Sequence, residues 1–90
     1  MKYLVVLHAD STAGKIYTHE KNDGFVDDGR VKHPLIVCTE LSMDNHHYMF
    51  VRRILNPTNS HQSLHLPHSS VAMVVQFAEE QQLPAGFHLD

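Results

Sequence analysis

The 90-residue sequence has no tryptophan, a single cysteine and no long hydrophobic run. One cysteine excludes an internal disulfide framework, and Cys38 lies within an apolar run, where a thiol is typically a small buried hydrophobe. No run approaches the roughly 18 apolar residues that a membrane span needs. The apolar stretch after Lys2 is too short for a signal-peptide core. We therefore expect one cytoplasmic domain, residues 1–90, with no membrane partner.

The sequence also lacks an excess of positive charge. Seven Lys and Arg stand against ten Asp and Glu, which gives a formal charge of −3. Proteins that depend on non-specific phosphate contacts are normally basic, so any RNA or nucleotide site must be local. Nine histidines complicate this balance, because partial protonation of imidazole near about pH 6.5 offsets negative charge.

Motifs for catalysis are missing as well. The sequence contains no Gly-rich phosphate loop and no Cys-x-x-Cys pair. Ser69 and Ser70 follow His68, but neighbours on a turn rarely have the geometry of a nucleophile and its base. The carboxylate pairs at 27–28 and 79–80 lie in polar segments that are typical of solvated surface. We expect no catalytic residue and no cofactor, and hence a protein that is not an enzyme.

What the sequence does contain is a series of short segments with alternating or continuous apolar character. These segments predict strands at 3–9, 15–19, 35–43, 48–55, 63–66 and 71–77, with a helical turn at 78–82. Asp-Gly pairs at 23–24 and 28–29 indicate turns, and a solvated turn is favoured there over a calcium loop. The pattern predicts a mainly β fold with little helix, as a small, strongly bent β-barrel or half-open sheet.

The strand expected at 48–55 is apolar on both faces. One face carries Met49, Val51 and Leu55, and the other carries Tyr48, Phe50 and Ile54. We expect this strand to be covered by the core on one side and by a neighbouring subunit or segment on the other, whereas the strand at 35–43 has one buried side. A domain this small buries limited surface, so self-association into a homo-oligomer is expected.

Residues 35–77 resemble the Sm-like family of small β-barrels, which includes bacterial Sm-type RNA chaperones. The first motif is "LIVCTELSMDNHHYMFV", with Asp44 at the family's corner Asp, and the second is "LHLPHSSVAMVV", with His68 where the family has Arg or His. The family's usual Gly is absent from the first motif, and Tyr48 replaces an Asn that many members use to bond a base. The resemblance implies rings of six or seven subunits that pair edge strands and bind RNA or nucleotides, with His46 where a base often stacks.

Together these features predict a ligand site, with Asp44 as a structural corner. The expected ligand-binding residues are His46, His47, Arg52, Arg53, His68 and Ser69. Imidazole can stack on a base, and Arg suits phosphate contacts. The alternatives are a polar corner for the histidines and, for an arginine, a surface pair with Glu40 across the sheet. Pro67 is expected to start a tight turn with the His68 imidazole projecting outward from its apex.

The histidines at 61, 65 and 68 raise the alternative of a metal site. On a strand, His61 and His65 share a face but lie about 13 Å apart, too far to coordinate one ion together. We therefore expect no metal within one chain, while a histidine site between subunits stays open.

The sequence thus favours a non-enzymatic, self-associating β-barrel that binds a small nucleotide or an RNA segment. The acidic net charge favours a small nucleotide over long RNA, and a viral protein of a phage that sequesters nucleotides would suit the size. The alternatives are a protein-interaction adaptor that uses an exposed β edge, and the histidine metal site between subunits.

Overall fold

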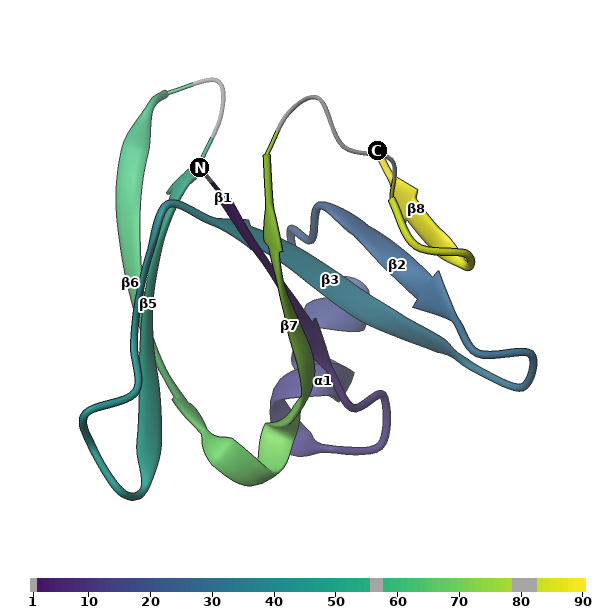
Figure 1. Ribbon diagram of the computed structural model, residues 1–90, viewed down its shortest axis with the longest axis horizontal. Helices are drawn as coiled ribbons and strands as arrows, with labels where there is room; N and C mark the ends of the chain where they lie inside the picture. The colour runs from purple at the N-terminus through teal and green to yellow at the C-terminus, as the bar shows by residue number, and fades with distance from the viewer. Residues whose placement is uncertain (1, 56–57, 79–82) are drawn as a thin grey trace.

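The computed structural model describes residues 2–55, 58–78 and 83–90. The strands are β1 (Lys2–Leu7), β2 (Gly24–Asp27), β3 (Lys32–Cys38), β4 (Glu40–Ser42), β5 (Tyr48–Leu55), β6 (Ser60–Pro67), β7 (Val71–Phe77) and β8 (Phe87–Leu89). One helix, α1 (Thr12–His19), and one 3₁₀ turn, η1 (His68–Ser70), complete the described elements. The fold is therefore mainly β, as the sequence predicts (Figure 1).

The strands form two antiparallel sheets. A five-stranded sheet has the order β7-β1-β3-β2-β8, and a three-stranded sheet has the order β4-β5-β6. Within the described residues neither sheet closes on itself, so a closed barrel stays a prediction. None of the helices in these residues has the length and apolar character needed to cross a membrane.

The strand expected at 15–19 is wrong, because these residues belong to helix α1. The Ser11 hydroxyl accepts a hydrogen bond from the Gly14 N–H at 2.9 Å and caps the first turn. Ala13 and Tyr17, four residues apart, pack on the core from one side of the helix. The cap and this spacing favour a helix over the short strand. Beyond the helix, the segment in which only turns were predicted contains β2, which pairs with β3 and β8.

The strand expected at 35–43 divides at Thr39 between the two sheets. Its first part is β3, which pairs with β1, and its second part is β4, which pairs with β5. Thr39 donates its N–H to the Arg52 carbonyl at 2.8 Å, so the chain keeps contact with β5 as it bends. This bend sets the three-stranded sheet against one face of the five-stranded sheet.

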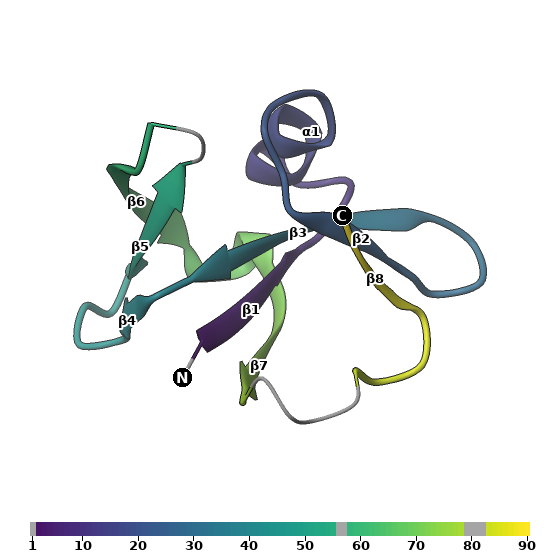
Figure 2. The ribbon, with the colours of Figure 1, turned by 90° about the horizontal axis from the view of Figure 1, so that it is seen from above.

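Apolar side chains cover both faces of the five-stranded sheet. The cluster between the two sheets contains Val5, Leu7, Ile36, Cys38, Met49, Val51 and Leu66. The opposite face holds Leu4, Val6 and Leu35, with Leu83 and Phe87 from the C-terminal segment packed on them. Figure 2 shows α1 on one side of β1 and β3 and the C-terminal segment on the other. The expectation of a single buried side for 35–43 is therefore wrong for β3.

The remaining predicted elements vary in accuracy. The strands at 48–55 and 71–77 are confirmed as β5 and β7. The strand at 3–9 is confirmed as β1 but ends at Leu7, and the strand at 63–66 is longer than expected as β6. The C-terminal segment contains β8, for which no strand was predicted. The helical turn expected at 78–82 falls mainly on 79–82, which lie outside the described residues.

Candidate nucleic-acid interface

The three-stranded sheet has one buried face and one face toward solvent, which we call the outer face. From β5 the outer face carries Tyr48, Phe50, Arg52 and Ile54, and from β6 it carries His61, Ser63 and His65. The register places Phe50 opposite His65, and Ile54 opposite His61. Tyr48 is 46% exposed and Ile54 is 40% exposed. Ile54 borders a hollow together with Val37 and Leu89, whereas no described segment of the chain covers the rings of Tyr48 and Phe50, although the sequence predicts cover on both sides of β5.

Phe50 is the centre of a small cluster on the outer face. Its ring centroid lies 5.4 Å from that of His65, with the two planes tilted by 57°. The Arg52 guanidinium lies 5.8 Å from the Phe50 ring centroid. An aromatic ring, an imidazole and a guanidinium therefore lie side by side, and all three groups can stack on a planar ligand.

Arg52 also pairs with Glu40, its cross-strand neighbour, at 3.3 Å. This is the surface pair considered for an arginine in the sequence. Both side chains are well exposed, so the pair contributes little to stability and leaves the guanidinium accessible to a second anion.

The loop between β4 and β5 lies at one end of the outer face. Its residues Asp44, His46 and His47 are exposed. Asn45 fixes the loop, because its side-chain oxygen accepts hydrogen bonds from the N–H groups of His47 at 2.8 Å and Tyr48 at 3.2 Å. This loop therefore presents two imidazoles near the start of β5.

His68 does not project freely from the turn after β6. Its Nε2 lies 2.8 Å from the Asn45 carbonyl oxygen, and its N–H donates to the His47 carbonyl at 3.3 Å. Since a carbonyl only accepts, Nε2 carries the proton. His68 thus links η1 to the β4–β5 loop and helps to hold this loop in position. This structural role does not depend on whether His68 also contacts a ligand.

Replacing His68 with alanine should lower the free energy of unfolding by about 1 kcal/mol, because the hydrogen bond between its ring and the Asn45 carbonyl is lost. His46→Ala is the matched control, since His46 is exposed in the same loop and should change stability by less than about 0.5 kcal/mol. Urea denaturation of both variants measures the difference. Equal stability of the two variants would show that the hydrogen bond from His68 to the Asn45 carbonyl does not stabilise the fold.

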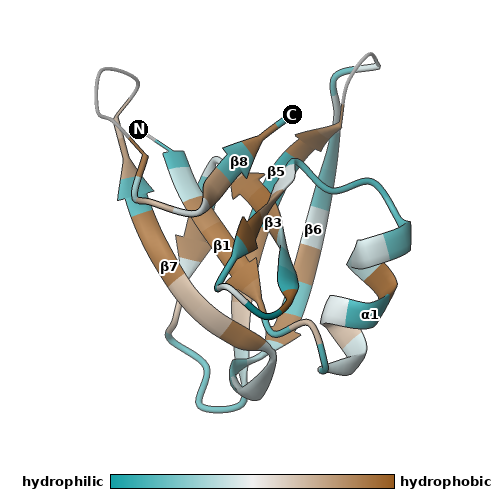
Figure 3. Ribbon diagram, turned by 90° about the vertical axis from the view of Figure 1, so that its right-hand side faces the viewer, coloured by the Kyte–Doolittle hydropathy of each residue, from teal (hydrophilic) through white to brown (hydrophobic). Residues whose placement is uncertain are grey.

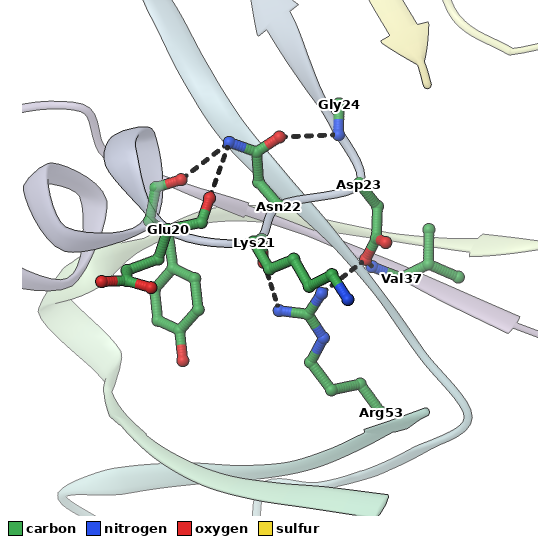
Figure 4. A network of polar contacts seen from close by, with 8 residues as sticks. Glu20, Lys21, Asn22, Asp23, Gly24, Val37 and Arg53 are labelled. Atoms are coloured by element: carbon green, nitrogen blue, oxygen red, sulfur yellow. Dashed lines mark hydrogen bonds and ion pairs between the residues drawn. The ribbon is translucent and has the colours of Figure 1, made fainter. Parts of the chain in front are cut away.

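Arg53, the neighbour of Arg52, points into the molecule and is 2% exposed. One guanidinium nitrogen donates to the Lys21 carbonyl at 2.9 Å, and the other lies 3.4 Å from an Asp23 carboxylate oxygen (Figure 4). The same carboxylate oxygen accepts the Val37 N–H at 2.7 Å. Arg53 therefore joins β5 to β3 and to the segment after α1, and it is separated from the outer face by the sheet itself.

Two potential nucleophiles lie near Arg53, the Cys38 thiol and the Tyr17 hydroxyl, and both have a raised pKa. Burial raises the pKa of the Cys38 thiol to about 12, so the thiol is uncharged, as expected for a buried hydrophobe. Burial also raises the pKa of Tyr17, whose ring lies 6.0 Å from the Arg53 guanidinium. The surroundings of Arg53 are those of a structural ion pair.

The acidic residues at the Asp28-Gly29 turn, Asp27 and Asp28, form hydrogen bonds within the chain. Asp28 accepts the N–H groups of Arg30 and Val31 and pairs with His33 at 2.8 Å. The Val31 N–H is the main cause that lowers the pKa of Asp28 well below its ordinary range. Asp27 accepts the Gly29 N–H at 2.8 Å. Across the described ranges, no three His, Cys, Asp or Glu side chains are arranged to hold a metal ion.

Ser69 lies apart from the outer face. It borders a hollow of about 600 Å³ at the start of α1, together with His8, Asp10, Ser11 and Thr12. The structure therefore brings together His46, His47 and His68, and places Arg52 on the adjoining outer face. Arg53 and Ser69 lie elsewhere.

Sequence reasoning did not name Phe50 and Tyr48 as ligand-binding candidates, and it considered His65 only as a metal ligand. The signal of Phe50 and Tyr48 was present in the sequence, because residues 48–55 are apolar on both faces and only one face can turn toward the core. The second apolar face was assigned to an interface with another subunit or segment instead of to a ligand.

Comparisons of the chain with protein-family models, curated proteins and solved structures found no match. The candidate site is accordingly defined by the geometry of its residues alone.

Proposed function

We propose that the protein is a non-enzymatic binding protein that holds a segment of single-stranded RNA, or a single nucleotide, against the outer face. The proposal rests on the cluster in which Phe50 lies beside the His65 ring and the Arg52 guanidinium. A base that stacks on one such side chain gains about 1–3 kcal/mol, and the gain depends little on which base it is. Arg52 can meet the accompanying phosphate.

The shape of the outer face favours a strand segment over an enclosed small molecule. Tyr48, Phe50, Arg52 and Ile54 follow one another along β5 with about 7 Å between successive side chains, as alternate residues of a strand do. An extended ligand can contact several of them in turn. The resemblance to the Sm-like family implies the same class of ligand, with His46 beside the site.

Charge limits how such a ligand binds. Arg52 shares its guanidinium with Glu40, and the chain carries a formal charge of −3. Few phosphates can be neutralised, so stacking supplies most of the affinity. Since each phosphate contact contributes a slope of only about −0.7 for single strands, affinity should fall weakly with salt.

The decisive variant is Phe50→Ala. Loss of one stacking surface should weaken binding of a labelled single-stranded RNA of mixed sequence by about 10-fold or more. Fluorescence anisotropy measures the affinity, and circular dichroism checks that the variant is folded. Unlabelled mononucleotides added as competitors distinguish a strand segment from a single nucleotide.

Phe25→Ala is the matched control. Phe25 also lies in a cluster with a histidine and a cation, since its ring stacks on His88 at 4.8 Å and Lys32 lies 4.6 Å from its centroid. This cluster belongs to the five-stranded sheet and should not affect binding. Wild-type protein that binds neither RNA nor nucleotides, or a Phe25→Ala variant that loses as much affinity as Phe50→Ala, would overturn the proposal and favour the adaptor interpretation.

A further inference from the structure

The outer edge of β7 has an unusual composition for an exposed strand. β7 is the terminal strand of the five-stranded sheet, and no described strand pairs with its other side. Its seven residues, VAMVVQF, include no charged residue, no proline and no glycine. Figure 3 shows β7 as a largely apolar ribbon at the margin of the molecule. An edge of this kind is a template for pairing with another strand.

The other sheet edges in the described part of the chain carry features that discourage pairing. β4 and β8 have three residues each. β6 is longer, but it carries His61 and His65 and ends at Pro67. Short length, polar side chains and proline are the usual means by which edge strands avoid one another. β7 is longer than β4 and β8, has no proline, and carries one polar side chain, that of Gln76.

The pairing of β7 with β1 limits which residues can form a regular new ladder. Val6 pairs with Met73 while Leu7 pairs with Val71, so Ala72 is an extra residue at an irregularity. Such bulges interrupt pairing. The regular part of the edge is therefore residues 73–77, with Val75 at its centre.

The side chains of this regular part are suited to meet their own copies. Met73, Val75 and Phe77 alternate on one face of the sheet. Val75 and Phe77 pack against the cluster of Leu4, Val6 and Leu35, whereas Met73 is 45% exposed. An antiparallel copy centred on Val75 would set each Met73 opposite Phe77 of the partner subunit.

We propose that two copies of the protein associate by antiparallel pairing of their β7 strands, with the two-fold axis at Val75. The pairing joins the two five-stranded sheets into one, and it covers the exposed Met73 with an aromatic ring, a favourable contact for a thioether. A second copy fits this edge because a two-fold pairing sets Val75 opposite Val75 and Met73 opposite Phe77, and it brings no like charges together.

Strand pairing alone buries less surface than a standard interface, so the dimer should dissociate on dilution. The association is independent of the proposed RNA site, since β7 and the outer face belong to different sheets. Failure of one proposal therefore leaves the other standing.

Sedimentation at tens of micromolar tests the dimer. Wild-type protein should show about twice the chain mass of 10.3 kDa. Met73→Lys should raise the dissociation constant by about 10-fold or more, because two lysines enter the pairing edge. Met43→Lys is the matched control, because it makes the same chemical change at another exposed position. Met43 lies in the β4–β5 loop and is 61% exposed. Monomeric wild-type protein, a ring of six or seven subunits, or equal masses for the two variants would overturn the proposal.

A cysteine at the axis tests the register without depending on the stability of Met73→Lys. Val75→Cys should form a disulfide between subunits under mild oxidation, because opposite residues of an antiparallel pair lie about 5 Å apart between Cβ atoms. Ala72→Cys, which is exposed but off the axis, should form little of it. The native Cys38 is buried and does not compete. Cross-linking of Ala72→Cys to the same extent as Val75→Cys, read on a non-reducing gel, would overturn the pairing.

Discussion

Replacing Arg53 with alanine is expected to lower the free energy of unfolding by about 3 kcal/mol, the scale found when a large buried side chain is truncated to alanine. The guanidinium is 2% exposed and holds both the Lys21 carbonyl and the Asp23 carboxylate. Its removal leaves the carbonyl without this partner and opens a cavity between β5 and β3. Urea denaturation, with the slope checked for two-state behaviour, measures the change.

Arg52→Ala is the control for this prediction. Arg52 is the adjacent residue on the same strand, but its pair with Glu40 is exposed and should contribute less than about 1 kcal/mol. Arg53→Lys retains the charge and removes the fork of donors, so its stability should fall between those of the wild type and Arg53→Ala. An Arg52→Ala variant as unstable as Arg53→Ala would show that the network in Figure 4 does not stabilise the fold.

Strands β3 and β5 show which features of the fold could be predicted from the sequence and which could not. Short apolar runs between polar corners located β5 and β7, because such runs are a local property of the chain. It could not reveal which faces are covered. β3 has both faces covered because Leu83 and Phe87 pack on the far face from a segment more than 40 residues later in the sequence. β5, expected to be covered twice, exposes Tyr48 and Ile54.

The candidate site was predicted in part for the same reason. His46 and His47 are exposed in one loop, and Arg52 lies on the outer face, as local sequence could indicate. The orientation of Arg53 depends on Asp23, thirty residues away, which local patterns do not report. His68 was expected to point outward, but a carbonyl 23 residues earlier in the chain holds its ring.

Helix α1 was missed because its strongest signals are polar. The sequence DSTAGK places a capping Ser11 and a glycine in the first turn, and glycine ordinarily weakens a helix. The structure supplies the reason for the glycine. Gly14 is buried against the turn that follows β1, and a Cβ at this position would overlap the carbonyl oxygen of His8.

Gly14→Ala is therefore expected to destabilise the protein by about 2 kcal/mol, as overpacking against a rigid neighbour does. The sign is the informative part, because the same substitution within an ordinary helix stabilises by about 1 kcal/mol. The His8 carbonyl cannot simply move away, since it accepts hydrogen bonds from the Ser11 N–H at 3.0 Å and the Ser11 hydroxyl at 2.7 Å. Chemical denaturation measures the change in stability.

Lys15→Gly separates the close contact from the intrinsic preference of the helix. Lys15 is the next residue of α1 and is exposed, so its replacement by glycine should cost about 1 kcal/mol through helix propensity alone. Both changes should then destabilise, although one adds a methyl group to the helix and the other creates a glycine in it. Only contact between Gly14 and the His8 carbonyl accounts for a loss in the first variant, and a gain in stability for Gly14→Ala would mean that α1 does not pack this closely on the turn after β1.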